Sequence, residues 1–270
     1  MRQMRPAAGH VSILRGSLGH RGGGPAATAG HGARGPEGGE AVKELPKPYY
    51  QDPWVQLFCG DAREILPLLP VGPNTAIVSD PPYGIGHVHG GGGKGKHNRR
   101  NHSMPIHEDG GDFDPAFLID AAPVVILWGA DHYSSRLPHG AWMAWDKLDH
   151  VPAYDNFSDV EFAWCNWRGK SRMFKYLWKG ICQAGEKDVM RLHPTTKPVA
   201  LMSWCVQLAD ARMKPGRAET IIDPFAGSGT TGRAAKDLGR KSILIEIDER
   251  YCEIAARRMR QEVLPLEFPE

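Results

Sequence analysis

Short apolar runs, each bounded by glycine, proline or other polar turn residues, recur along the chain from residue 55 onward. The candidate strands are Val55–Cys59, Thr75–Ser79, Pro123–Trp128, Trp142–Trp145, Thr220–Ile222 and Lys241–Ile247. Brief runs rich in β-branched and aromatic residues between turn signals are typical of buried strands. The pattern therefore predicts the central sheet of an α/β protein.

Helical patterns lie between or after these runs. We expect helices over Ala62–Leu69, after Pro198, over Thr230–Leu238 and over Glu249–Glu262. Proline suits a first helical turn, and Gly239 is a typical helix end. The 249–262 pattern predicts Tyr251, Ile254, Ala255 and Met259 inward, and Arg257, Arg258 and Arg260 largely outward.

The stretch Asp80-Pro81-Pro82-Tyr83 directly follows the predicted strand Thr75–Ser79. Consecutive prolines have a fixed φ and no N–H, so they hold the chain extended and aim the Pro81 carbonyl in one direction. Asp80 and this carbonyl then form two rigid acceptors. They suit an exocyclic nucleobase amine, whose lone pair is freed when both N–H bonds are accepted, while Tyr83 offers a face for stacking. An ordinary strand-ending turn is the alternative, because Asp and Pro are common in turns.

A second stretch, Asp223-Pro224-Phe225-Ala226-Gly227-Ser228-Gly229-Thr230-Thr231, follows the run Thr220–Ile222. Its glycines permit close approach of a ligand, and a helix beginning near Thr230 presents free N–H groups. It is not a phosphate loop, which needs Gly-Lys before Ser/Thr, and it lacks the third glycine of a dinucleotide fingerprint. Glu246 nevertheless lies about 20 residues on, where an acidic residue can hold a ribose.

These two stretches, together with His193-Pro194-Thr195-Thr196-Lys197-Pro198, resemble the amino-methyltransferases that use S-adenosylmethionine to modify DNA. The order, catalytic stretch first and cofactor loop last, resembles their permuted beta class. The resemblance covers roughly residues 55 to 260. One small departure is Thr196, where the family usually has Gln.

The resemblance implies a Rossmann-like α/β methyltransferase fold, circularly permuted, with a mostly parallel sheet and an inserted target-recognition region. It implies a catalytic set of Asp80, Pro81, Pro82 and Tyr83. The implied S-adenosylmethionine-binding set is Asp61, Thr195, Lys197, Asp223, Phe225, Gly227, Gly229, Thr230 and Glu246. In the family a residue like Asp61 reaches the cofactor's adenine amine, whereas an ordinary helix N-cap is the alternative here.

The implied substrate is duplex DNA, with the target base flipped out of the helix. Adenine N6 is the preferred target, because the family's cytosine-N4 members more often carry Ser where this chain has Asp80. Alternatives are cytosine N4, a non-catalytic DNA-binding protein on the same fold, and RNA or protein as substrate. A homodimer and a cognate restriction endonuclease are compatible with the sequence, which specifies neither.

Composition divides the 270 residues into a tail and one large domain, 49–270. Residues 1–48 carry seven Lys/Arg and three Glu, a net charge of +4, so the remainder carries −2 of the total +2. The tail is rich in glycine and poor in aromatics, so we expect it to be disordered. Without a run of about 18 apolar residues or a signal peptide, we expect a cytoplasmic protein.

Two segments of the domain are candidates for DNA contact. Residues 84–111 are glycine-rich and basic, with five histidines in no recognised metal spacing, and we expect a mobile arm without a metal. Between Phe162 and Gly185 cations alternate with aromatics, inside the predicted target-recognition region of about 146–190. A half-buried antiparallel strand with its lysines outside is the alternative. The five widely spaced cysteines fit reduced thiols.

Overall fold

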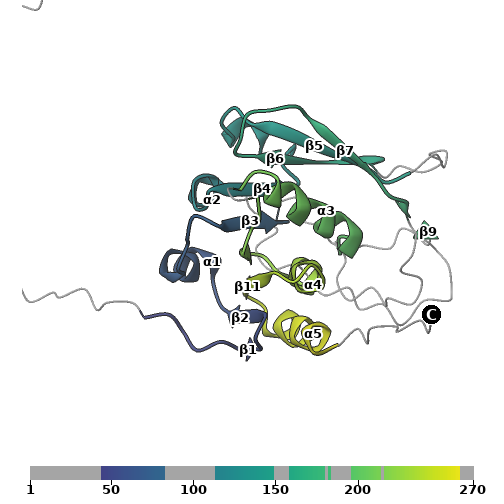
Figure 1. Cartoon of the computed structure of the whole chain (residues 1–270). Helices are drawn as coiled ribbons and strands as arrows, with labels where there is room; N and C mark the ends of the chain where they lie inside the picture. Colours follow the sequence, from purple (N-terminus) through teal and green to yellow (C-terminus); the bar gives the residue numbers. More distant parts are fainter. Residues whose placement is uncertain are drawn as a thin grey trace, which may run out of the picture. The chain divides into compact units, whose positions relative to one another are not determined.

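The computed structural model describes residues 44–82, 113–148, 158–179, 182–183, 196–213 and 216–261. Its centre is a nine-stranded sheet in the order β1-β2-β11-β10-β3-β4-β6-β5-β7 (Figure 1). These strands are β1 (Tyr50–Gln51), β2 (Val55–Cys59), β3 (Thr75–Ser79), β4 (Val124–Trp128), β5 (Ala141–Asp146), β6 (Val160–Cys165), β7 (Arg172–Lys175), β10 (Thr220–Asp223) and β11 (Lys241–Glu246). The strands β8 (Trp178–Lys179) and β9 (Cys182–Gln183) pair separately.

The five strands β2, β11, β10, β3 and β4 run parallel to one another. Strands β3, β4 and β10 consist of buried or nearly buried residues, as expected for parallel strands covered on both faces. On the β4 side, β6 pairs antiparallel with both β4 and β5, and β7 pairs parallel with β5. The predicted α/β fold with a mostly parallel sheet is confirmed, and β10 pairs with β3 at its centre.

Helices cover both faces of the sheet (Figure 1). Helices α3 (Val199–Asp210), α4 (Thr230–Asp237) and α5 (Glu249–Arg260) lie on one face, and α1 (Ala62–Ile65) and α2 (Ala116–Ile119) on the other. The described residues also contain two 3₁₀ turns, Leu66–Leu68 and Ser134–Arg136. Leu201 and Cys205, four residues apart on one face of α3, are fully buried against the sheet.

One prediction about α5 is wrong. Arg258, expected to point outward with its arginine neighbours, is buried at 8% exposure. Its guanidinium donates from Nη1 to the Thr230 hydroxyl at 2.6 Å. A buried guanidinium needs such acceptors, so this arginine joins α5 to the beginning of α4.

Several expectations fall outside the described residues. They concern most of the 1–48 tail, the 84–111 loop and parts of the 146–190 region. In the described parts of the chain, no helix is both long and apolar enough to span a membrane. The four cysteines whose side chains are described, Cys59, Cys165, Cys205 and Cys252, carry free thiols.

Candidate active site

Strands β3 and β10 place two acidic residues at neighbouring carboxyl ends. The strands pair in register, with Ile77 opposite Ile222. Ser79, the last residue of β3, donates its hydroxyl to Asp223 Oδ1 at 2.6 Å, across 144 positions of sequence. This bond joins the Asp80 turn to the loop that follows β10, at the edge where parallel sheets bind ligands.

The Asp80 turn begins directly after the buried strand. The Asp80 side chain is 15% exposed, Pro81 is buried and Pro82 is half-buried. Proline restricts both its own φ and the conformation of the preceding residue. The direction of the chain after Asp80 is therefore set by covalent geometry as well as by packing.

The loop after β10 is held by its first residue and by the neighbouring strand. Asp223 Oδ1 accepts from the Phe225 N–H at 3.1 Å, and Ala226 N donates to the Ile245 carbonyl of β11 at 2.9 Å. Gly227 and Gly229 have φ of 50° and 79°, a region that favours glycine. Gly229 is the N-cap of α4, so the positive end of the helix dipole lies at this loop.

Glu246, the last residue of β11, joins its strand to the same loop. Its Oε2 accepts from Gly227 N at 2.8 Å, and its Oε1 accepts from Asp248 N at 2.9 Å. The residue is 9% exposed. Each carboxylate oxygen has a second lone pair, so the two backbone contacts leave acceptor capacity for a pair of hydroxyls.

Burial changes the titration of both loop carboxyls. Burial raises the pKa of Asp223 to about 6, against the opposing hydrogen bonds from Ser79, Thr231 and the Phe225 N–H. Burial also raises the pKa of Glu246, opposed by the N–H groups of Asp248 and Gly227. Hydrogen bonds to the ionised form oppose desolvation in each case.

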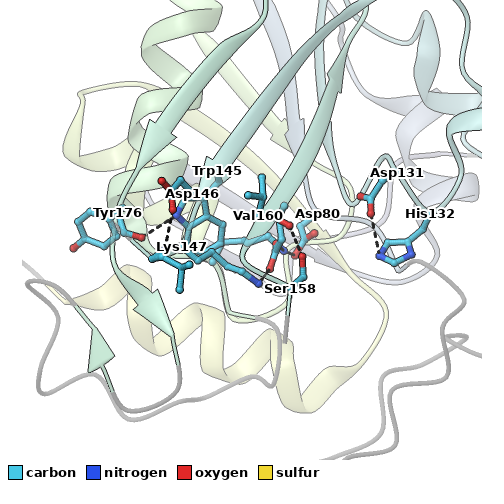
Figure 2. Close-up of polar contacts among 12 residues, drawn as sticks. Asp80, Asp131, His132, Trp145, Asp146, Lys147, Ser158, Val160 and Tyr176 are labelled. Atoms are coloured by element: carbon cyan, nitrogen blue, oxygen red, sulfur yellow. Dashed lines mark hydrogen bonds and ion pairs between the residues drawn. The ribbon is translucent and has the colours of Figure 1, made fainter. Parts of the chain in front are cut away.

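Asp80 also belongs to a row of four side chains whose charges alternate in sign. The Lys197 ammonium lies 2.6 Å from Asp80 Oδ2 and 3.1 Å from Glu161 Oε2, and the Lys147 ammonium lies 3.1 Å from Glu161 Oε1. Figure 2 shows the side chains of Asp80 and Lys147 converging on this region. The four residues come from the β3 turn, the approach to α3, strand β6 and the end of β5.

This network compensates a deeply buried cation. The Lys197 side chain is 6% exposed. Burial lowers the pKa of its ammonium, but the carboxylates of Asp80 and Glu161 more than reverse this effect and hold the pKa above its ordinary value. Burial likewise raises the pKa of Glu161, and Lys197 and Lys147 bring it below its ordinary value. Each carboxylate of the network therefore lies beside an ammonium that compensates its charge.

The structure brings most of the expected site residues to one edge of the sheet. Asp80, Asp223 and Glu246 all stand at strand ends, and the glycine loop lies between β10 and α4. Asp61 is the N-cap of α1 and accepts from Arg63 N, which agrees with the alternative considered for it. Lys197 contacts Asp80 and Glu161, and its assignment to the cofactor-binding set stays a prediction.

The remaining expected residues are Phe225, Thr230, Tyr83 and Thr195. The Phe225 ring meets Phe113 and Phe117 edge-to-face at 5.7 and 6.3 Å between centroids. Thr230 is buried and accepts from Arg258. Tyr83 and Thr195 lie outside the described residues.

Sequence reasoning missed Glu161 and Lys147. Glu161 stands in the run Val160–Cys165, next to the exposed Phe162 and the buried Ala163. An acidic residue at the start of a strand is normally a solvent-facing residue. An acidic residue next to a region rich in cations predicts that the acidic residue forms an ion pair. The sequence does not show which cation is the partner.

Most aromatic residues of the 162–185 region are packed into the core, whereas Phe162 is 39% exposed. Trp164 is buried, and Trp167, Phe174, Tyr176 and Trp178 pack against the core cluster that includes α3. Phe174 stacks on Trp204 of α3 with centroids 5.2 Å apart. The cations Arg168, Lys170, Arg172 and Lys175 are exposed. The outward cations match the half-buried strand alternative, although β7 pairs parallel with β5 where an antiparallel strand was considered. They leave a basic outer surface.

The residues at the glycine loop fit an adenosyl cofactor. Glycines at positive φ permit close approach of a ligand to the backbone, and a buried carboxylate at the end of the next strand suits ribose hydroxyls. Among the described residues no cluster of His, Cys, Asp and Glu has the arrangement of a metal site.

Comparisons with known proteins agree with this geometry. A family described as DNA methylase matches residues 125–257. The type II methyltransferase M.ScaI of Streptomyces caespitosus is 26% identical over 272 aligned residues, covering 83% of this chain and 87% of the relative. The type II methyltransferase M2.DpnII of Streptococcus pneumoniae is 37% identical over 116 residues, covering 43% of this chain and 38% of the relative.

The fold also has a solved counterpart. The cytosine-N4-specific PvuII DNA methyltransferase aligns with 83% of this chain and 91% of its own, at a TM-score of 0.50 and 16% identity. This likeness concerns the fold, because identity at that level carries no information about the target base.

Proposed function

We propose that this chain, a DNA methyltransferase that uses S-adenosylmethionine and is related to type II enzymes, methylates the N6 amine of adenine in duplex DNA. One observation carries the proposal. Asp80, paired with the Lys197 ammonium and followed by two prolines, stands at the end of β3 directly beside the Asp223 loop at the end of β10.

The chemistry of an exocyclic amine explains why such a turn is needed. The lone pair of the amine is delocalised into the base, so the nitrogen is a poor nucleophile. Two acceptors that take both N–H bonds favour a pyramidal nitrogen and stabilise the positive charge that develops on it. We assign these roles to the Asp80 carboxylate and the Pro81 carbonyl, with Tyr83 as the stacking partner of the base.

We assign the cofactor to the loop between β10 and α4. Glu246 would accept hydrogen bonds from the ribose hydroxyls, and the glycines at 227 and 229 would allow close backbone approach. When bound, S-adenosylmethionine supplies a methyl group on a sulfonium, which is open to direct displacement by the amine. Asp223 would act indirectly, since its described hydrogen bonds hold Ser79 and the loop backbone.

The target base must leave the duplex to reach this edge of the sheet. A base inside the stack cannot present its amine to a buried carboxylate, so base flipping is required. The exposed cations of residues 168–175 are the proposed phosphate contacts, within a target-recognition region of about 146–190. The type II relatives support a place in DNA restriction and modification.

Sequencing of DNA from cells that express the protein, with a readout that separates modified bases, tests the proposal. We expect N6-methyladenine at one recurring sequence, absent from cells that express Asp80→Ala. N4-methylcytosine at such a sequence would instead assign the cytosine-N4 reaction. DNA without either base, from cells that contain folded protein, would refute methyl transfer to DNA and favour a non-catalytic DNA-binding protein.

A further inference from the structure

We propose that Glu161 is a positioning residue for Asp80, acting through Lys197, and that Lys147 completes the charge balance of the site. The inference rests on the proposed function, because it assigns Glu161 a part in the reaction that Asp80 serves. Glu161 itself contacts neither the loop at 227–229 nor Glu246 in any described interaction.

The contacts form one continuous path. From Asp80 Oδ2 the path crosses 2.6 Å to Lys197 Nζ, 3.1 Å to Glu161 Oε2 and then, from Oε1, 3.1 Å to Lys147 Nζ. Glu161 Oε2 is shielded from solvent, and its described contact is the ion pair with the Lys197 ammonium. The Lys197 ammonium therefore compensates it mainly by charge, which is a long-range and orientation-tolerant interaction.

Rigid elements hold both ends of this path. Glu161 is paired with Trp145 in the β5–β6 ladder, and Lys147 N continues that ladder by donating to the Asp159 carbonyl at 2.9 Å. Lys197 precedes Pro198, the N-cap of α3. Because a strand pair and a helix start fix these charges, the position of the Lys197 ammonium is defined, and so is that of the Asp80 carboxylate.

The signs of the charges matter for the reaction. Asp80 and Glu161 are negative, Lys197 and Lys147 are positive, and the four together are neutral. During methyl transfer the attacking nitrogen gains positive charge. A neutral cluster tolerates this charge, whereas a cluster that has lost Glu161 carries +1 beside the nitrogen and opposes it. Lys197 would also be drawn more strongly to Asp80, which weakens Asp80 as an acceptor.

Steady-state kinetics on Glu161→Gln test this inference, since Gln keeps the shape and removes the charge. We expect kcat to fall by at least about tenfold, equivalent to about 1.4 kcal/mol in the barrier. KM for duplex DNA and the calorimetric Kd for S-adenosylmethionine should stay within about twofold of wild type, because the cofactor and phosphate contacts are unchanged.

A second substitution separates charge balance from structural support. Lys147→Met in the Glu161→Gln background removes one positive charge and restores neutrality, so we expect kcat to recover most of the loss. If Glu161 merely supported the fold, this second loss of a contact would lower kcat further or leave it unchanged. Asp210→Asn is the matched control, because it breaks a comparably buried ion pair with Arg240 in another part of the fold and should reduce stability without changing kcat.

A Glu161→Gln variant with kcat within about twofold of wild type overturns the inference, and so does a double variant as slow as the single one. If Glu161→Gln does not fold, Glu161→Met replaces it, since Met also removes the charge at similar length, and an unchanged kcat there also overturns the inference. Wild-type protein that transfers no methyl group to DNA contradicts the proposed function. Wild-type activity that depends on Asp80 but not on Glu161 contradicts the positioning role alone.

Discussion

Single carboxylates at this site differ in what surrounds them, and the surroundings determine what each can do. Asp80 pairs with a buried ammonium, Glu246 accepts two backbone N–H bonds, and Asp223 is enclosed and joined to Ser79. The three therefore suit three tasks, namely contact with the target, contact with a ribose and support of the loop.

Replacement of Asp80 by Ala should abolish methyl transfer while leaving cofactor affinity nearly unchanged. The lost acceptor acts on the target amine, and such a loss from a buried site costs about 3 kcal/mol or more in the transition state, by analogy with oxyanion-hole donors. Single-turnover methylation and calorimetry with S-adenosylmethionine measure the two effects. A variant that keeps more than about a tenth of wild-type activity would show that Asp80 has another role.

Cofactor affinity should instead fall in Gly227→Val and in Glu246→Ala. The first forces a β-branched residue into φ of 50°, and the second removes the acceptor at the end of β11. Calorimetry with S-adenosylmethionine measures the loss, with circular dichroism to establish folding. Arg257→Ala, on the exposed side of α5, is the control and should bind normally. If both variants fold and bind S-adenosylmethionine with wild-type affinity, the assignment of the cofactor to this loop is wrong.

The sequence identifies Asp80, Gly227, Gly229 and Glu246 as candidate site residues, because each lies in or next to a recognisable motif at a strand end or turn. It does not indicate Glu161 or the burial of Arg258. Their partners lie 36 and 28 positions away, respectively, at Lys197 and Thr230. Local periodicity contains no information about such pairs, so only the assembled fold reveals them.

The position of strand β7 determines which cations are exposed for the proposed contact with DNA. Strand β7 is at the end of the strand order, and its residues Arg172, Met173 and Lys175 are exposed while Phe174 packs toward α3. Its cations therefore face solvent, with Lys175 48% exposed despite an Asp146 oxygen 4.0 Å away. Phe174, between them in the strand, stacks on Trp204 of α3 and so packs against the core.

Replacing Arg172 and Lys175 together by Ala should weaken binding to all duplexes alike. Each phosphate contact releases about one counterion, so the slope of log K against log salt should flatten by roughly two. Fluorescence anisotropy at several salt concentrations gives the slope. Lys241→Ala is the matched control, because Lys241 is exposed at the amino end of β11. An unchanged slope in the double variant would place the DNA elsewhere.

Element boundaries follow the sequence closely where turn residues are explicit. The predicted strands at Val55, Thr75 and Thr220 begin where the structure has them. The helix predicted over Ala62–Leu69 is instead a short α-helix followed by a 3₁₀ turn, because Pro67 cannot continue the α-helical hydrogen bonding. The parallel pairing of β7 with β5 was not predicted, since nothing in either run specifies a partner.

For the whole molecule, the titration of Asp223 links pH to stability. Its folded pKa of about 6 lies above the unfolded value of 3.8, so the folded state binds more protons between these values. The contribution of Asp223 to the free energy of unfolding therefore falls as pH rises from about 4 to about 6. At 1.36 kcal/mol for each pKa unit, the full change is about 3 kcal/mol.

The difference in stability between wild type and Asp223→Asn isolates this contribution, because all other titrating groups are present in both proteins. We expect the stability of wild type relative to the variant to be greater at pH 5 than at pH 7.5, as measured by urea unfolding at both pH values. A difference between the two proteins that is independent of pH, or that grows toward pH 7.5, would contradict the assigned protonation.

The strand order also determines when during synthesis this protein can become an enzyme. Strand β2 has β11 as its parallel neighbour, with Cys59 opposite Glu246, and β10 and β11 both lie between β2 and β3. At about 5–20 residues per second, β2 emerges from the ribosome on the order of ten seconds or more before its partner exists. A nascent chain that ends before Glu246 therefore lacks both the parallel neighbour of β2 and the ribose-binding carboxylate proposed above, so we expect no methyl transfer before β11 has been synthesised.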